Sequence, residues 1–296
     1  MQAWHHSPWF QQVPEDVRDF AAASYPWRIE AAVYASDLRR RLPDGLAMPR
    51  ALGILDREPD SVVLWLEAVD HLPQRWDAER FERAAYLLGR LSGSRDVAEL
   101  ADVGDFDWSV MTYVVGRVQH DLAGRVMSDE AWLEPRVACW FGDDLRHRIR
   151  AGCRRVEELG NELMGMPRLA AHGDACPGNL IAGRESGQLV LIDFGFWLRN
   201  AVGFDLGQLV GGDVQLGRVP DVPLEELDER CVAAYTEGLA AEGLAIDAAV
   251  VRRAHALQLF LFSGVSSLPD EGMTDGQVAA RAQLARLSVD LLDRTG

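Results

Sequence analysis

Hydrophobic and polar positions follow two different periods along the chain, and the period changes near residue 70. From Trp27 to Leu42 apolar residues recur every four or five positions, which predicts a helix that the Pro-Asp-Gly at 43–45 ends. The segments from Pro49 to Ile54 and from Ser61 to Val69 are rich in apolar and β-branched residues. A polar turn at 56–60 separates them, so we expect a β-hairpin.

Beyond residue 70 the spacing of apolar residues is helical over long stretches. Glu79 to Leu91 places its apolar side chains on one face, as in an amphipathic helix. Further helices are expected at about 108–126, 143–163, 224–242, 247–263 and 277–292. One β-rich run, Leu189 to Ile192, interrupts them after a turn at 185–187 and predicts an embedded hairpin. The pattern therefore predicts an α+β chain with a small β-containing segment, residues 1–69, and a mainly helical segment, residues 70–296.

Composition excludes several classes of protein. With 48% hydrophobic and 26% charged residues the chain is typical of a soluble globular protein, and it contains no apolar run of 18 residues that would cross a membrane. A formal net charge of −16 argues against nucleic acid as a partner, because phosphate binding needs clustered cations. The four cysteines are widely spaced, which is typical of free thiols in a cytoplasmic protein. Of the partner classes considered, a small molecule is therefore the one that the composition favours.

The cationic side chains are all of one kind. The sequence contains no lysine, so all 30 of its Lys and Arg residues are arginines. An arginine presents a planar fork of donors and does not replace a lysine ammonium, which is a compact point charge. No step of a reaction that needs a lysine ammonium can therefore be served by this chain.

The densest chemical signal lies in the second half of the sequence. His172-Gly173-Asp174 begins a loop that ends at Asn179, and Asp193-Phe194-Gly195 starts 14 residues after Asn179. Asp174 and Asn179 lie in a Gly- and Pro-containing loop, where their side chains can converge. Asp193 ends an apolar β-run, so its carboxylate is expected at the rim of the same hairpin. Two acids and an amide around one cavity suit a hydroxyl-activating base beside a site for a hard metal ion.

This order of parts resembles the aminoglycoside phosphotransferase and choline kinase families, relatives of the protein kinases. The resemblance implies a protein-kinase-like fold in which Asp174 is the catalytic base and His172 braces its loop. It also implies that Asn179 and Asp193 hold Mg²⁺ on the phosphates of ATP or GTP. Asp205 matches the later family aspartate that ties down the catalytic loop.

The same resemblance extends to the first lobe, where it is incomplete. Glu30 is the best match for the family's helix glutamate, which pairs with a strand lysine. The strand that holds Trp65, followed by Glu67, matches the hinge that receives adenine. Upstream of Glu30 there are only 29 residues, with no glycine before Gly45, so the Gly-rich phosphate-covering loop has no counterpart and the N-terminal lobe is curtailed.

Three interpretations follow. The chain begins at an internal Met, or it binds ATP in a reduced way, or its scaffold no longer uses ATP. The first functional hypothesis is a phosphotransferase that acts on a hydroxyl of an amino sugar, a choline-like alcohol or a natural product, with Mg²⁺ and ATP or GTP. The alternative is a repurposed kinase-fold protein, either a nucleotide-independent enzyme or a ligand-binding protein, with no cofactor. The sequence specifies neither the individual substrate nor the oligomeric state.

Overall fold

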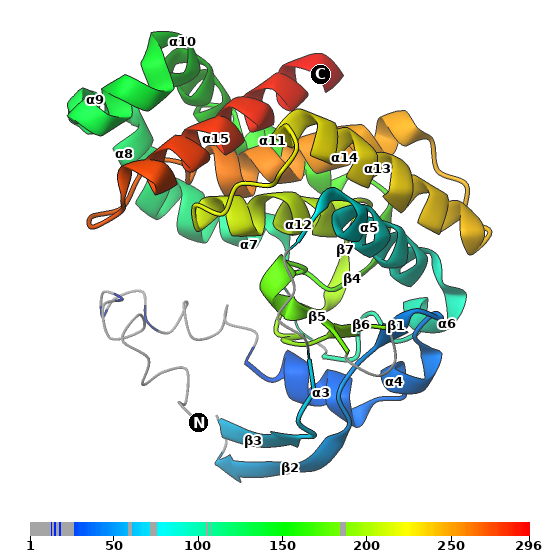
Figure 1. Ribbon diagram of the computed structural model, residues 1–296. Helices are drawn as coiled ribbons and strands as arrows, with labels where there is room; N and C mark the ends of the chain where they lie inside the picture. The colour runs from blue at the N-terminus through cyan, green and yellow to red at the C-terminus, as the bar shows by residue number, and fades with distance from the viewer. Residues whose placement is uncertain are drawn as a thin grey trace.

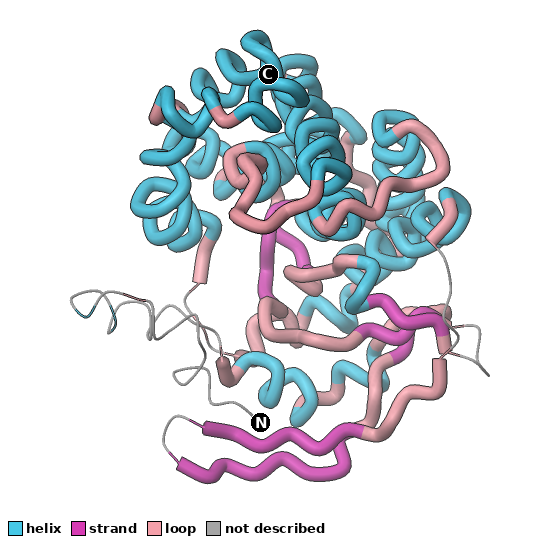
Figure 2. The backbone as a smooth tube through the Cα atoms, turned by 60° about the vertical axis from the view of Figure 1, so that its left-hand side comes forward, coloured by secondary structure: helices cyan, strands magenta, loops and turns pink. Residues whose placement is uncertain are grey.

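The structure, a computed structural model, describes residues 27–58, 61–71, 76–104, 106, 108–183 and 188–296, together with positions 13, 15 and 18. The centres of the two turns expected at 56–60 and 185–187 lie outside these residues. Figures 1 and 2 show a helical part at one end, a long β-ribbon with short helices at the other, and short strands between them. The catalytic-loop motif lies in this middle region, between β4 and β5.

The first elements contain one correction to the expected pattern. The helix predicted from Trp27 to Leu42 is wrong as a single element, because the chain forms α3 (Ile29–Ala35) and then α4 (Leu38–Arg41). The Ser36 hydroxyl donates to the Val33 carbonyl and accepts from the Leu38 amide, so a side chain takes over backbone hydrogen bonds and the helix breaks there.

The expected hairpin is confirmed with shifted bounds. Strands β2 (Ala51–Glu58) and β3 (Ser61–Leu66) pair antiparallel, with Ile54 opposite Leu64. The second strand ends at Leu66 and does not reach Val69. The short strand β1 (Leu46–Ala47) precedes this ribbon and was not predicted.

The helices after residue 70 fall within most of the predicted stretches, but the single helix predicted at about 143–163 is wrong, because α10 ends at Cys153 and α11 begins at Val156. The helices are α5 (Ala78–Gly93), α6 (Arg95–Ala98), α7 (Val110–Tyr113), the π-helical η3 (Val114–Leu122), α8 (Ala123–Met127), α9 (Asp129–Leu133), α10 (Pro135–Cys153), α11 (Val156–Met164), α12 (Phe204–Gln215), α13 (Leu224–Ala241), α14 (Ala248–Leu259), the π-helical η5 (Phe260–Gly264) and α15 (Asp275–Thr295). Helices α6, α9 and α12 were not predicted. None of the described helices is long and apolar enough to cross a membrane.

Two small sheets surround the catalytic-loop motif. In the first, β6 (Leu189–Leu191) lies between β5 (Leu180–Ala182), which is antiparallel to it, and β1, which is parallel to it. In the second, β4 (Arg168–Ala171) pairs antiparallel with β7 (Leu198–Ala201). The embedded hairpin is thus β5–β6, and β1 joins it from the N-terminal segment. The domain boundary between residues 69 and 70 stays a prediction.

The most extensive packing between two helices is that of α5 and α13, which lie side by side (Figure 1). A Cβ atom on Gly89 would lie 2.1 Å from the Tyr235 carbonyl oxygen, and one on Gly238 would lie 2.1 Å from that of Tyr86. The two backbones therefore touch where neither helix has a side chain. This close packing fixes α5 against α13 in the core of the helical part.

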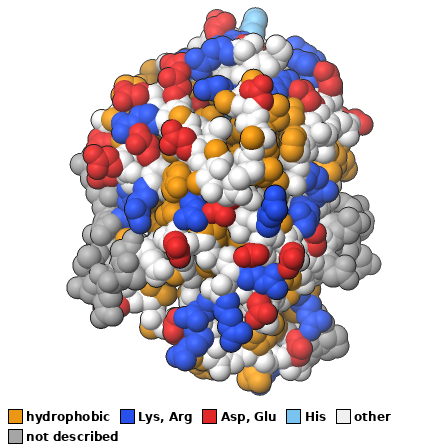
Figure 3. All heavy atoms as spheres, turned by 90° about the vertical axis from the view of Figure 1, so that its right-hand side faces the viewer, with side chains coloured by type: hydrophobic (Ala, Val, Ile, Leu, Met, Phe, Trp, Pro, Cys, Tyr) orange, Lys and Arg blue, Asp and Glu red, His pale blue; other side chains and the backbone are white. Residues whose placement is uncertain are grey.

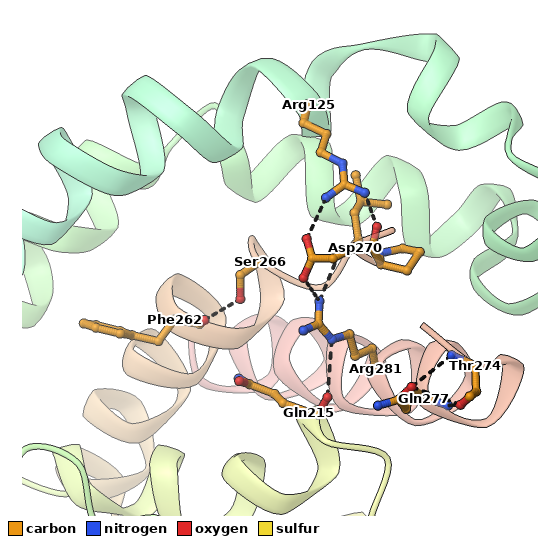
Figure 4. A network of polar contacts seen from close by, with 10 residues as sticks. Arg125, Gln215, Phe262, Ser266, Asp270, Thr274, Gln277 and Arg281 are labelled. Carbon is orange, nitrogen blue, oxygen red and sulfur yellow. Dashed lines mark hydrogen bonds and ion pairs between the residues drawn. The ribbon is translucent and has the colours of Figure 1, made fainter. Parts of the chain in front are cut away.

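A polar network fixes the far end of α12 (Figure 4). Asp270, in the loop before α15, binds Arg125 of α8 and Arg281 of α15, each at 3.3 Å. Arg281 also donates to the carbonyl of Gln215, the last residue of α12, at 3.5 Å. The C-terminal end of α12 is thereby held against the start of α15.

The surface carries charges of both signs despite the formal net charge of −16. On the face shown in Figure 3, arginine and acidic side chains are interspersed with apolar ones. Exposed ion pairs such as Arg148–Asp293 and Arg294–Glu225 also occur in the described part of the chain.

Candidate active site

The loop after β4 is held from behind by a buried carboxylate. Asp205, in the first turn of α12 and 1% exposed, accepts hydrogen bonds from the His172 amide at 2.9 Å and the Gly173 amide at 2.8 Å. Burial raises the pKa of Asp205 to about 6, although these two hydrogen bonds act in the opposite direction. The start of the loop is therefore fixed to the start of a core helix.

His172 connects the two halves of the motif. Its ring is fully buried, with Nε2 3.0 Å from the Ile192 carbonyl oxygen and Nδ1 3.4 Å from the Asp174 amide. A carbonyl only accepts and an amide only donates, so the ring is the neutral tautomer with its proton on Nε2. Burial lowers its pKa to about 4, which keeps it neutral. This arrangement agrees with a bracing role and leaves His172 no free nitrogen for proton transfer.

Gly173 is required by the path of the chain. Its φ is +84°, in the left-handed region, and a Cβ atom there would lie 2.1 Å from the Phe196 carbonyl oxygen. The loop thus passes directly against the segment that follows Asp193. A side chain at this position would push the two segments apart.

Asp174 and Asn179 lie together. The Asn179 amide nitrogen donates to the Asp174 carboxylate at 3.1 Å and to its backbone carbonyl at 2.9 Å. Both side chains are half-buried. Burial raises the pKa of Asp174, the nearby charge of Asp193 raises it further, and the Asn179 hydrogen bond lowers it. The carboxylate is thus held in one orientation, with the Asn179 carbonyl oxygen left as an acceptor.

Asp193 enters the site through an unusual backbone conformation. Its φ of +62° makes it the one described residue other than glycine in the left-handed region. Such strain at a polar residue is typical of functional sites. Its side chain is exposed, and its charge acts on Asp174, Glu30 and Tyr34. The structure therefore brings together Asp174, Asn179 and Asp193, while their roles stay a prediction.

Glu30 and Tyr34, one turn apart on α3, face this group from the other side. Burial raises the pKa of Glu30, Asp193 raises it further, and the Phe194 amide that donates to its carboxylate lowers it. The Tyr34 ring packs edge-on against Phe194, with centroids 5.6 Å apart. The Tyr34 hydroxyl is buried without a hydrogen-bond partner. Among the described residues, no arginine forms an ion pair with Glu30, Asp174 or Asp193.

The two residues predicted to receive adenine lie on strand β3 and directly after it. The Trp65 side chain is 62% exposed on β3. The Glu67 carboxylate accepts from the Arg50 amide at 2.8 Å, and the Glu67 amide donates to the Arg50 carbonyl at 3.0 Å. Glu67 thus closes the open end of the β2–β3 ribbon. In the described part of the chain neither residue has a hydrogen bond or ion pair to the catalytic loop, and adenine binding by them stays a prediction.

Sequence reasoning missed Tyr34 and a cavity beside Pro177 and Gly178. The sequence does contain one signal for Tyr34, because it follows Glu30 by four positions and so shares its helix face. The cavity has no such signal, since its walls come from α5, the catalytic loop and the end of α12.

The fold is similar to that of proteins of known structure, although the sequence matches none of the known families. No family model matches the sequence, and no curated protein matches it. Among solved structures, an aminoglycoside phosphotransferase from Alicyclobacillus acidocaldarius aligns with a TM-score of 0.56 and 14% identity, over 91% of this chain and 82% of that one. An ethanolamine kinase from Plasmodium vivax aligns with a TM-score of 0.50 and 12% identity, over 92% and 74%. The chain has a small-molecule kinase fold.

This fold agrees with the family suggested by the motifs. An aminoglycoside phosphotransferase and an ethanolamine kinase are among the structural neighbours, and the kinase-like α+β architecture is confirmed. At 12–14% identity the likeness establishes the fold alone. The chemistry has to be argued from the residues of the site.

Proposed function

We propose that the chain is a small-molecule O-phosphotransferase. It transfers the γ-phosphate of ATP or GTP to a hydroxyl group of an amino sugar, a choline-like alcohol or another natural product. The observation that carries the proposal is the Asn179–Asp174 hydrogen bond, in a loop fixed by Asp205 and within reach of the Asp193 charge. The kinase-like fold supports it.

The reaction assigns a separate task to each residue. Asp174 accepts the proton of the substrate hydroxyl while the hydroxyl oxygen forms its bond to the γ-phosphorus. The bond between that phosphorus and the β,γ-bridging oxygen breaks, and the nucleoside diphosphate leaves. A raised pKa makes Asp174 a stronger base than an exposed aspartate. Asn179 orients its carboxylate, and His172 and Asp205 hold the loop in place.

The donor set fits Mg²⁺. Asn179 turns its nitrogen toward Asp174, so its carbonyl oxygen and the exposed Asp193 carboxylate are hard oxygen ligands. The acidic side chains around them have no arginine partner among the described residues, so a cation would relieve their mutual repulsion. When bound there, Mg²⁺ neutralises the charge of the nucleotide phosphates.

A second candidate is favoured by the first lobe. The sequence contains no lysine, and Glu30 accepts a hydrogen bond from the Phe194 amide where the family pairs a glutamate with an ammonium group. A scaffold without this contact would act as a nucleotide-independent enzyme or as a ligand-binding protein. Its ligand would then occupy the region around Asp174.

Acceptor-dependent release of ADP or GDP distinguishes these candidates. The chain is incubated with Mg²⁺, ATP or GTP, and a panel of aminoglycosides, choline and ethanolamine. At least one acceptor should stimulate release, and Asp174→Asn, which keeps the shape of the side chain, should lower the rate roughly 10²-fold or more. Release that no acceptor stimulates, or that Asp174→Asn leaves unchanged, would favour the second candidate.

A further inference from the structure

The β2–β3 ribbon lies at one end of the molecule, and among the described residues its two strands pair with each other and with no third strand (Figures 1 and 2). A two-stranded ribbon has two open edges, and the unpaired N–H and C=O groups along an open edge can pair with a further strand. The two edges of this ribbon are built differently, which indicates the one that is a pairing surface.

The β2 strand has features by which proteins prevent the pairing of an open edge. Its register against β3 shifts at two places, after Ala51 and after Asp56. At each shift β2 contains one residue more than β3, which is a β-bulge that bends the strand locally. The strand also ends in the charged sequence Asp56-Arg57-Glu58. Bulges and charges both keep a neighbouring chain from adding to an edge.

The β3 strand has neither feature. Residues 61–66 read Ser-Val-Val-Leu-Trp-Leu, with no charged residue, no glycine and no proline. Each residue of β3 follows the last without a bulge, and in the described part of the chain no backbone group outside β2 bonds to this strand. A six-residue segment of high β propensity and no charge is the kind that pairs with an identical segment of another chain.

The ribbon also leaves one of its faces apolar and exposed. Leu64 and Leu66 lie on its inner face, where they pack against the core. Because alternate residues of a strand share a face, Val63 and Trp65 lie together on the outer face. Leu55 of β2 is opposite Val63 and is 57% exposed, while Trp65 is 62% exposed. A strand added beside β3 would pack its own side chains against Val63 and Trp65.

We propose that β3 pairs antiparallel with the β3 strand of a second copy of this chain. A two-fold axis perpendicular to the ribbon places Val63 beside Val63 of the other copy and joins the two ribbons into one four-stranded sheet. An identical strand fits this edge because β3 is uncharged, so the pairing brings no like charges of the two strands together. The bulged and charged β2 strands become the outer edges, so the assembly ends at a dimer. The dimer does not depend on the proposed phosphotransfer.

Sedimentation velocity of the full chain over a range of concentrations tests the proposal. It should show a monomer–dimer equilibrium with a Kd on the order of 10 µM, because one strand edge is a small interface. Val63→Lys places two like charges beside each other across the axis and should raise the Kd about fivefold or more, as should Val63→Glu. An equimolar mixture of the two variants should associate again, because opposite charges then face each other. Leu55→Lys, on the same face but on β2, is the matched control and should change the Kd less than about twofold.

Hydrogen exchange of the β3 amides in the wild type gives a second measurement, and their protection should rise with protein concentration. The melting temperature of each variant shows whether it folds. Full protection already in the dilute monomer would mean that another segment of the same chain covers the edge, which would overturn the proposal. A monomer up to about 200 µM (roughly twentyfold above the expected Kd), or a dimer that Val63→Lys leaves unchanged, would also overturn it. So would a mixture of Val63→Lys and Val63→Glu that stays monomeric, because the axis would then not pass near Val63.

Discussion

The Asp205 carboxylate accepts a hydrogen bond from the Gly173 backbone amide at 2.8 Å, across 32 residues of sequence. A second oxygen of the same carboxylate accepts from the neighbouring His172 amide. An asparagine at position 205 has only one acceptor oxygen, and its NH₂ group would face a second N–H donor. We expect Asp205→Asn to lower the free energy of unfolding by roughly 1–3 kcal/mol. Urea denaturation measures this, with the exposed Asp221→Asn as control.

The pH dependence of this loss has a defined sign. Burial raises the pKa of Asp205 from 3.8 to about 6, so its contribution to stability is full below about pH 4 and is lost as the pH rises through 6. The amide side chain of the Asp205→Asn variant does not titrate. The stability difference between wild type and variant should therefore shrink between pH 5 and pH 7. A difference that grows over this range would contradict the assignment.

Gly173 provides a test of the loop geometry that leaves every charged group in place. Gly173→Ala forces a left-handed φ on a residue with a Cβ atom, which would also lie against the Phe196 carbonyl. We expect a loss of roughly 2–4 kcal/mol in the free energy of unfolding. Gly178→Ala in the same loop is the matched control, because its nearest neighbour would be the Cys176 sulfur at an ordinary 3.8 Å. Equal melting temperatures for the two variants would contradict the account.

Much of the helical part could be predicted from the sequence, because long helices repeat their apolar positions several times. Glu79 to Leu91 lies inside α5, for example, and its apolar face is buried. The strands β1, β4, β5 and β7 have two to four residues each, too few to show a period. The break at Ser36 depends on where one hydroxyl group points, which a pattern of apolar positions does not contain.

The residues of the candidate site likewise include some that could be predicted from the sequence and some that could not. His172, Asp174 and Asn179 belong to one loop, so their proximity could be predicted from spacing alone. The approach of Tyr34 to Phe194, and of Glu30 to the Phe194 amide, depends on how α3 packs against the hairpin. Tertiary packing of this kind leaves no local signal in the sequence.

The ionised Glu30 carboxylate should destabilise the folded protein near neutral pH when no metal ion is bound. Burial and the charge of Asp193 raise its pKa, so its contribution to stability is present below its unfolded pKa and is lost as the pH rises through the folded one. Glu30→Gln keeps an acceptor for the Phe194 amide and removes the charge. At pH 7.5 without metal we expect the melting temperature to rise by roughly 1–3 °C. The exposed Glu229→Gln should leave it unchanged, and a fall in Glu30→Gln would contradict the assignment.

The negative charge of Asp193 should have a measurable effect on the pKa of Asp174. Asp193 raises the pKa of Asp174 through its negative charge, so Asp193→Asn should lower that pKa. Carbon-detected NMR titration of the aspartate carboxyl groups measures it directly. The same variant should bind Mn²⁺ about tenfold more weakly or worse, as followed by electron paramagnetic resonance. An unchanged Asp174 titration would show that the two carboxylates do not act on each other.

The central claim is that Asp193 and Asn179 form a metal-dependent nucleotide site without a lysine. Calorimetric titration of the 296-residue chain with ATP tests it most directly, with and without Mg²⁺. The account predicts binding only with Mg²⁺, with a Kd on the order of 0.1–1 mM, because the sequence contains no lysine to make a charge-assisted contact worth about 1.5–3 kcal/mol with a phosphate. Asp193→Asn should abolish this binding, and Glu229→Gln should not. Binding that is independent of Mg²⁺ and unchanged in Asp193→Asn, or no binding at 10 mM Mg-ATP (about tenfold above that range), would contradict the claim.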